Sequence, residues 1–159
     1  MANPPDEVMF SASVRAEQAR RGTRKAYARR AAAGRFEREL SAEVIAFIGE
    51  RNSAYFATAS ADGQPYVQHR GGPAGFLRVL DPHTVAFANY AGNSQYISIG
   101  NLAENERAFL FLMDYASARR LKLWGHARVD SDEAGDTIVF SVLAWDWNCS
   151  KYIPKLVAP

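Results

Sequence analysis

The chain has 159 residues, of which 48% are hydrophobic and 23% charged, a composition that excludes wholesale disorder and fits a globular protein. Its net charge of +2 is unevenly distributed, because residues 1–38 hold nine Lys and Arg against four Asp and Glu, whereas the other residues hold ten against thirteen. The single cysteine, Cys149, excludes an internal disulfide, and no apolar stretch approaches the length of a membrane span. We therefore expect a cytoplasmic protein with no membrane partner.

The N-terminal segment is basic and rich in helix-forming residues. Residues 1–7 are polar and contain two prolines, which predicts a frayed start. Residues 13–33 are mainly Ala, Arg, Glu and Gln, which predicts one helix ending at Gly34. Because large apolar residues are few there, we interpret residues 1–40 as a solvated arm that lies on the rest of the chain or on a partner subunit. Contact of its arginines with nucleic acid is the alternative, although we expect no such partner.

A second helix and a series of strands follow, in a domain that we assign to residues 41–159. Ser41 is placed to cap a helix whose apolar face includes Val44, Phe47 and Ile48. Alternating segments between turn residues predict strands at 54–60, 65–70, 76–80, 84–89, 107–115, 121–129 and 137–144. Ser94 is expected to cap a short helix between the fourth and fifth strands. Short strands joined by tight turns predict a small antiparallel barrel.

The motifs of several common enzyme classes are absent from the sequence. It contains no Gly-x-Ser-x-Gly elbow, no Walker loop and no His-Glu-x-x-His. The three histidines are scattered, so we expect no metal site, although convergence of distant histidines in the fold stays an alternative. A nucleophilic role for Cys149 is a further alternative to simple packing.

Two polar segments are candidates for ligand binding. In the second strand, alternation sends Gln68 and Arg70 to one face and His69 to the other. An arginine beside glycines can hold an anion, and the alternative is an arginine exposed to solvent. The segment 89–95 leads into the short helix, whose free N–H groups can bind a phosphate, and the alternative is an ordinary capped turn.

Two of the three tryptophans, Trp145 and Trp147, lie near the C-terminus. They can close the mouth of the barrel or sandwich an aromatic ligand. The residues alone therefore indicate a small barrel suited to a flat ligand that carries a phosphate.

Several segments together resemble the pyridoxamine 5′-phosphate oxidase-like family of FMN-binding split barrels. The resemblance covers about residues 44–150. The segments are 47–58, 62–72, 87–93, 100–105, 121–128 with its Trp124-Gly125 pair, and 145–149.

The resemblance implies a mainly β fold, an antiparallel split β-barrel with flanking helices, in a homodimer with FMN bound at the subunit interface. By position, it implies flavin contacts from one strand, phosphate contacts at the helix start, and tryptophans contributed by the partner subunit. The implied cofactor-binding residues are Gln68, His69, Arg70, Gly71, Phe87, Ala88, Asn89, Asn93, Ser94, Gln95, Arg120, Trp145 and Trp147. His69 and Arg70 are the candidates for a catalytic role.

The sequence also departs from the pyridoxamine phosphate oxidases proper. Those enzymes have an Arg-Lys pair where this chain has Asn93-Ser94, and an Arg-x-His pair that is missing from residues 151–159. We therefore expect an FMN-dependent oxidoreductase acting on another small molecule with a reduced electron donor. The alternatives are a non-catalytic flavin or tetrapyrrole-binding sensor or carrier, and a barrel that binds a deazaflavin.

Overall fold

The computed structural model describes residues 3–149, 151–154 and 156. The helices within them are α1 (Pro5–Met9), α2 (Ala12–Arg20), α3 (Arg24–Ala32), α4 (Ala42–Gly49) and α5 (Ile97–Glu104). The strands are β1 (Ser53–Ala59), β2 (Pro65–Gly71), β3 (Arg78–Asp81), β4 (Thr84–Ala88), β5 (Arg107–Asp114), β6 (Arg119–Asp132) and β7 (Gly135–Trp147). Over this described part, no helix is both long enough and apolar enough to cross a membrane.

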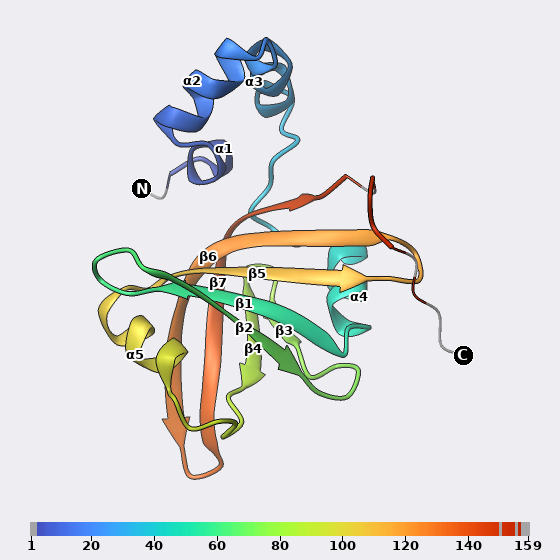
Figure 1. Ribbon diagram of the computed structural model, residues 1–159. Coiled ribbons are helices and arrows are strands. Elements are labelled where there is room, and N and C mark those ends of the chain that lie inside the picture. The colour runs from blue at the N-terminus through green and yellow to red at the C-terminus, as the bar shows by residue number, and fades with distance from the viewer. Residues whose placement is uncertain (1–2, 150, 155, 157–159) are drawn as a thin grey trace.

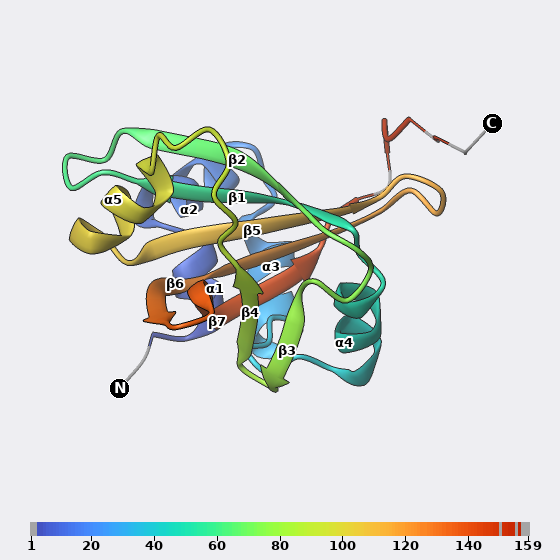
Figure 2. The same ribbon diagram turned by 90° about the horizontal axis from the view of Figure 1, so that it is seen from below.

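All seven strands belong to one antiparallel sheet with the order β2-β1-β5-β6-β7-β4-β3. The sheet is strongly curled, so that β3 and β4 run across the direction of the long strands β5 and β6 (Figures 1 and 2). The helices α4 and α5 lie at opposite ends of the sheet in both views. This arrangement confirms the mainly β, antiparallel fold with flanking helices that the sequence predicts.

The hydrophobic core lies between the concave face of the sheet and α4. Strand β1 has an alternating pattern in which Ala54, Phe56 and Thr58 are buried, as expected for a strand with one face in the core. Helix α4 contributes Val44, Phe47 and Ile48, and its first turn is capped by the Ser41 hydroxyl, which accepts a hydrogen bond from the Val44 N–H. Both sequence expectations for this helix are confirmed. The core residues from the other strands include Phe87, Leu110, Leu112, Leu121, Leu123, Ile138 and Phe140.

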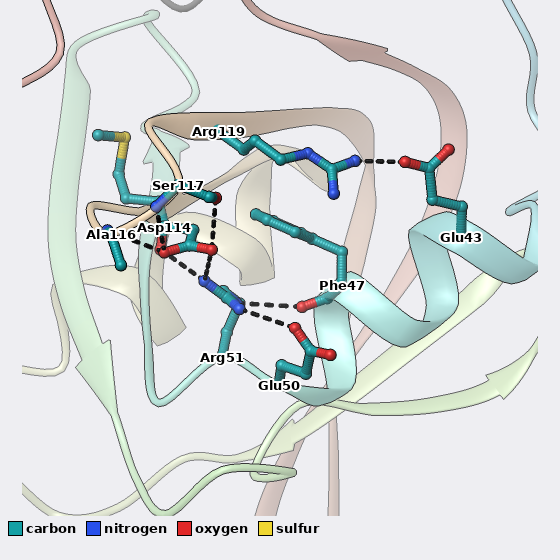
Figure 3. A network of polar contacts seen from close by, with 9 residues as sticks. Glu43, Phe47, Glu50, Arg51, Asp114, Ala116, Ser117 and Arg119 are labelled. Atoms are coloured by element: carbon teal, nitrogen blue, oxygen red, sulfur yellow. Dashed lines mark hydrogen bonds and ion pairs between the residues drawn. The ribbon is translucent and has the colours of Figure 1, made fainter. Parts of the chain in front are cut away.

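A network of polar contacts holds α4 against the turn between β5 and β6 (Figure 3). The Arg51 side chain is 11% exposed, and it donates to the Phe47 carbonyl at 3.1 Å and lies 3.4 Å from Asp114 Oδ2. On the other side of the turn, Ser117 Oγ donates to Asp114 Oδ2 at 2.6 Å. A second arginine, Arg119, pairs with Glu43 on the first turn of α4. The network fixes the start of β6, from which Arg120 projects.

The N-terminal arm contains three short helices, so the expectation of a frayed start and one helix over 13–33 is wrong. A helix, α1, already begins at Pro5, where the missing N–H of proline costs nothing. The chain then breaks between α2 and α3 at Gly22, which has a φ of 76°. This left-handed conformation ends α2 and is accessible to glycine without strain. The expected stop at Gly34 is confirmed, because that glycine follows α3 with a φ of 64°.

The arm is joined to the barrel through aromatic and backbone contacts. The ring of Phe10 lies 5.4 Å from Tyr27 and 5.4 Å from Phe36, and none of the residues in α1, α2 or α3 is fully buried. Helix α1 lies beside β7. The linker that leaves the arm pairs with the end of β7, where the Trp145 N–H donates to the Glu37 carbonyl at 3.0 Å. Figure 1 shows the three helices grouped outside the curled sheet.

Candidate functional site

The edge strand β2 carries the first part of the candidate site. Its residues alternate between half-buried and exposed, with Gln68 and Arg70 on the half-buried face and His69 exposed. The sequence prediction of two faces is therefore confirmed. The Tyr66 hydroxyl lies 3.1 Å from Gln68 Oε1 and orients that amide. Strand β2 thus presents two polar side chains toward the inside of the curl.

One nitrogen of the Arg70 guanidinium has a hydrogen-bond partner, and another has none among the described residues. Its Nη1 donates to Asn89 Oδ1 at 3.0 Å, and the guanidinium carbon lies 5.9 Å from the centroid of the Phe56 ring. Its Nε is buried without a hydrogen-bond partner among the described residues. Burial lowers the pKa of the guanidinium, which nevertheless stays a cation because arginine titrates far above neutral pH. A half-buried cation with a free N–H favours an anionic ligand.

The segment between β4 and α5 supplies backbone donors. Asn93 Oδ1 accepts from the Gln95 N–H at 3.2 Å, and Asn93 Nδ2 donates to Gln95 Oε1 at 3.2 Å. The prediction that Ser94 caps the helix is wrong, because the N-cap is Tyr96 and no side chain caps the first turn. Ser94 and Tyr96 have φ values of 58° and 53°. Their left-handed conformations turn the chain before the helix can begin at Ile97, so its first N–H groups have no side-chain acceptor.

The structure adds one residue that the sequence analysis misses. Ser98 in the first turn of α5 is 1% exposed, and its Oγ has no hydrogen-bond partner among the described residues. The pattern hides it because a helix start at Ser94 would leave Ser98 in the second turn. The true start at Ile97 brings Ser98 to the end of the helix where N–H groups are free. The sequence could point to Ser98 as a site residue only if the start of the helix after the left-handed Tyr96 were already known.

These residues line one pocket, which we call the Arg70 pocket and which has an empty volume of about 310 Å³ with open solvent included. It is lined by Gln68, Arg70, Asn89, Tyr90, Ala91, Gly92, Asn93, Ser94, Tyr96, Ile97, Ser98 and Ile99. Among the described residues, this lining contains one cation, several neutral hydrogen-bond donors and no carboxylate. Together with the N-terminal end of α5, this set provides a positive potential suited to a phosphate or another oxyanion. Figure 2 shows α5 beside the β1–β2 hairpin.

Several expected cofactor-binding residues lie at the border of this pocket rather than in it. Phe87 is fully buried, and its ring packs 5.5 Å from Phe56, so only its backbone is available for a ligand. Ala88 is exposed at the end of β4 and borders a neighbouring hollow. Gln95 is exposed beside Asn93, and Gly71 is exposed at the end of β2. These four residues are near the pocket in sequence, but the pocket lining does not include them.

His69 and Arg120 point to a different surface, the convex face of the sheet. His69 is exposed and packs edge-on against Tyr55, with ring centroids 5.8 Å apart. Arg120 borders a hollow of this face, and its guanidinium donates to the carbonyl groups of Cys149 and, at 3.4 Å, of Lys151. Neither residue therefore lies in the Arg70 pocket of its own chain.

The two C-terminal tryptophans lie within β7, which extends beyond the predicted strand end at residue 144. Trp145 Nε1 donates to the Glu39 carbonyl at 2.9 Å, which fixes the linker to the arm. Trp147 packs edge-on against Phe47 at 5.0 Å, and the Arg119 guanidinium lies 4.2 Å above its ring. Both indoles are half-buried in contacts within their own chain. A role in a ligand site of a second copy remains a prediction.

The convex face itself is unusually apolar for an exposed surface. Val67 is 59% exposed, and it shares a shallow hollow with aromatic and aliphatic side chains of β1 and β5. These side chains are Tyr55, Ala57, Phe109, Phe111 and Met113. Contiguous apolar surface of this kind is typical of protein–protein contacts. We call this set, with Val67, the convex apolar face.

Comparisons with known proteins identify relatives of this chain. A family profile described as Pyridoxamine 5′-phosphate oxidase matches residues 40–152. A putative pyridoxamine 5′-phosphate oxidase from Lactobacillus delbrueckii is 18% identical with a TM-score of 0.55, covering 69% of this chain and 95% of that chain. The HupZ protein from Group A Streptococcus is 15% identical with a TM-score of 0.55, covering 74% of this chain and 99% of that chain.

A third solved structure belongs to the same group. A Clostridium acetobutylicum protein related to general stress protein 26 of the pyridoxinephosphate oxidase family is 12% identical with a TM-score of 0.52, covering 67% of this chain and 85% of that chain. No curated protein matches the sequence. The solved structures show that the mainly β fold of this chain is a split barrel, as the sequence resemblance predicts.

Proposed function

Because the chain belongs to the pyridoxamine 5′-phosphate oxidase family, whose fold is that of flavin-binding oxidoreductases, we propose that it binds FMN and is an FMN-dependent oxidoreductase. Its substrate is a small molecule, and its electrons come from a reduced donor. The observation that carries the proposal is the Arg70 pocket, where Arg70 Nε and Ser98 Oγ are buried without hydrogen-bond partners among the described residues. We infer that the phosphate of FMN is the partner of both groups.

The residues present fit such a ligand. A phosphate in a protein site needs donors that replace its water, since a desolvated anion without partners is unstable. Arg70 offers its free Nε, and the N-terminal end of α5 offers backbone N–H groups. In the part of the chain that the structure describes, no carboxylate that would repel the phosphate lines the pocket. The Asn93-Ser94 pair supplies neutral donors where the Arg-Lys pair of the oxidases proper would supply charge, so Arg70 is the main cation.

When bound, FMN supplies the redox chemistry, and the protein supplies binding, orientation and local electrostatics. Arg70 holds the phosphate by a charge-assisted hydrogen bond. Gln68, oriented by Tyr66, is available to a polar edge of the ring system from the same strand. No residue of the chain is required as a covalent nucleophile.

We further propose that the functional unit is a homodimer in which a second copy covers the convex apolar face. The exposure of Val67 and the hollow around Phe109 and Phe111 support this step, because such a surface is unfavourable in water. Arg120, Trp145 and Trp147 lie outside the Arg70 pocket of their own chain, so they can serve a flavin only in the pocket of a partner. Light scattering after size exclusion measures the mass and tests this step.

The absorption spectrum of the freshly purified protein tests the cofactor. Bound oxidised flavin gives peaks at roughly 375 and 450 nm, with FMN added first if the protein is colourless. These peaks, together with bleaching by a nicotinamide donor, would support the oxidoreductase. A stable flavin complex that no donor reduces would instead favour a sensor or carrier. Protein that neither contains nor takes up flavin would overturn the proposal.

A further inference from the structure

The structure contains two buried polar side chains that make a direct comparison possible. Among the described residues, Thr58 is 3% exposed and Ser98 is 1% exposed. The Thr58 hydroxyl accepts a hydrogen bond from Asn101 Nδ2 at 2.9 Å, whereas Ser98 Oγ has no partner in that part of the chain. Both side chains lie where α5 meets the sheet. An unpaired buried hydroxyl lowers stability, so its retention needs an explanation.

The chain just before Ser98 explains why the hydroxyl is free. A serine inside a helix can donate to the carbonyl four residues earlier, which here belongs to Ser94. Ser94 and Tyr96 both have positive φ, so the chain at these residues is not helical and Ser98 makes no such bond. The same turn leaves the first N–H groups of α5 without a side-chain cap. Ser98 and the N-terminal end of α5 thus border one pocket, and the buried hydroxyl and the first N–H groups of the helix are unused donors beside it.

The rest of that pocket defines the chemistry of the missing acceptor. Arg70 borders it with a buried Nε that also lacks a partner, and the described residues place no carboxylate in its lining. An oxyanion with several oxygen atoms, such as a phosphate, can accept from a guanidinium N–H, a hydroxyl and helix N–H groups together. A single carbonyl group has too few lone pairs to take all of these bonds.

We propose that the Ser98 hydroxyl donates a hydrogen bond to the phosphate of bound FMN and makes the site selective for the phosphorylated flavin over riboflavin. This inference rests on the proposed function and deepens it, because it names the group that distinguishes the two flavins. Ser98 is a specificity residue, and it takes no part in the redox step. Its unpaired state in the free protein is the cost of holding a donor ready for the ligand.

The variant Ser98→Ala tests the inference through binding rather than turnover. Dissociation constants for FMN and for riboflavin are measured by quenching of flavin fluorescence, and thermal unfolding is measured without flavin. We expect FMN to bind about ten- to one-hundredfold more weakly, as for loss of a hydrogen bond to a charged group, with riboflavin binding unchanged. The unfolding midpoint without flavin should stay equal or rise, because the variant removes an unpaired polar group. Equal loss of affinity for both flavins, or no loss for FMN, would overturn the inference.

Thr58→Val is the matched control, since it also removes a buried hydroxyl beside α5. It leaves Asn101 Nδ2 without its acceptor, so the unfolding midpoint should fall while the preference for FMN over riboflavin is kept. A control that lost the preference as strongly as Ser98→Ala would show a general effect of α5 and would also overturn the assignment.

A further measurement distinguishes failure of this inference from failure of the proposed function. If the wild-type protein binds neither flavin, the flavin proposal fails, and inorganic phosphate then serves as the probe. Thermal stabilisation by phosphate in the wild type that is lost in Ser98→Ala would support Ser98 as a ligand of a phosphate from another source. No stabilisation of the wild type by phosphate would overturn the inference.

Discussion

Arg70 Nη1 donates to Asn89 Oδ1 at 3.0 Å and thereby joins two strands that lie near opposite ends of the sheet order. Strand β2 is one edge of the sheet, and Asn89 directly follows β4, which is next to the other edge. The rings of Phe56 on β1 and Phe87 on β4 meet at 5.5 Å below this contact. The two ends of the curled sheet therefore meet through side chains rather than through a ladder. The Arg70 pocket lies at this seam.

Arg70→Ala should give folded protein that purifies without colour. The substitution removes the cation that the described residues place in the Arg70 pocket, together with the bond to Asn89, so we expect FMN affinity to fall about one-hundredfold or more. The ratio of flavin absorbance to protein absorbance and the dissociation constant for FMN measure the effect. Arg70→Lys, which keeps the charge but not the fork of donors, should give an intermediate affinity.

Arg128→Ala is the control, because it also removes an arginine side chain from a strand. The Arg128 side chain is 62% exposed on β6 and pairs with Asp130, so its loss should change neither flavin content nor stability by much. Full flavin occupancy in Arg70→Ala would contradict the role assigned to Arg70.

Asp114→Asn should reduce stability at neutral pH in a manner that depends on pH. The hydrogen bond from Ser117 and, to a smaller extent, the nearby Arg51 hold the pKa of the Asp114 carboxyl below its usual range. A lowered pKa means that the native state favours the charged form, so the contribution is complete above the unfolded pKa of about 4. It is lost as the pH falls through the native pKa. The free energies of unfolding in urea should therefore differ at about pH 7 and converge toward about pH 3, on the acid side of the usual carboxyl pKa of about 4.

Glu133→Gln serves as the reference for removal of an exposed carboxylate, because Glu133 lies in the turn between β6 and β7. Its difference from the wild type should be small at every pH. A difference for Asp114→Asn that stayed constant across the range would show that the carboxylate charge is not what stabilises the turn.

Gly125→Ala should destabilise the barrel strongly. The pairing register of β6 with β7 shifts between Trp124 and Gly125, and a Cβ at Gly125 would come within 2.6 Å of the Phe140 ring and closer still to the Ser141 carbonyl. Backbone and a buried ring cannot both move away, so we expect a loss of about 3 kcal/mol in the free energy of unfolding, at the upper end for overpacking. Chemical denaturation measures it. Gly49→Ala at the end of α4, where a Cβ meets nothing within 4 Å, should be neutral or slightly stabilising; similar losses in both variants would contradict the steric argument.

The sequence predicted the strands well because their alternation is strong and their turns are short. Strands β1 and β2 pair as an antiparallel hairpin on either side of the Asp62-Gly63 turn, and Ser41 begins α4 as its position predicts. The pattern failed where a single backbone conformation decides the outcome. Gly22 reads as a tolerated residue inside an alanine-rich helix, but its left-handed conformation separates α2 from α3.

The site was predictable on β2 and only partly beyond it. Alternation alone puts Gln68 and Arg70 on one face of β2, whereas the start of α5 depends on Ser94 and Tyr96, two residues that rarely adopt positive φ. Without that turn, the position of Ser98 relative to the helix end cannot be inferred. The partners of Trp145 and Trp147 were equally hidden, because they come from the linker and α4, about one hundred residues earlier in the chain.

The arm offers a last test, because one aromatic cluster joins its helices. Phe10→Ala removes the ring that contacts both Tyr27 and Phe36, while α2 and α3 contain no fully buried residue of their own. We expect trypsin to cleave within the arm about tenfold faster, since local opening then costs less free energy, with no change in the unfolding midpoint of the barrel or in flavin binding. Val14→Ala, which shortens an apolar side chain that is 41% exposed on α2, is the control. Unchanged cleavage of the Phe10 variant would mean that other contacts hold the arm in place, and repeating the digestion over a range of protein concentrations would then reveal whether a second copy provides them.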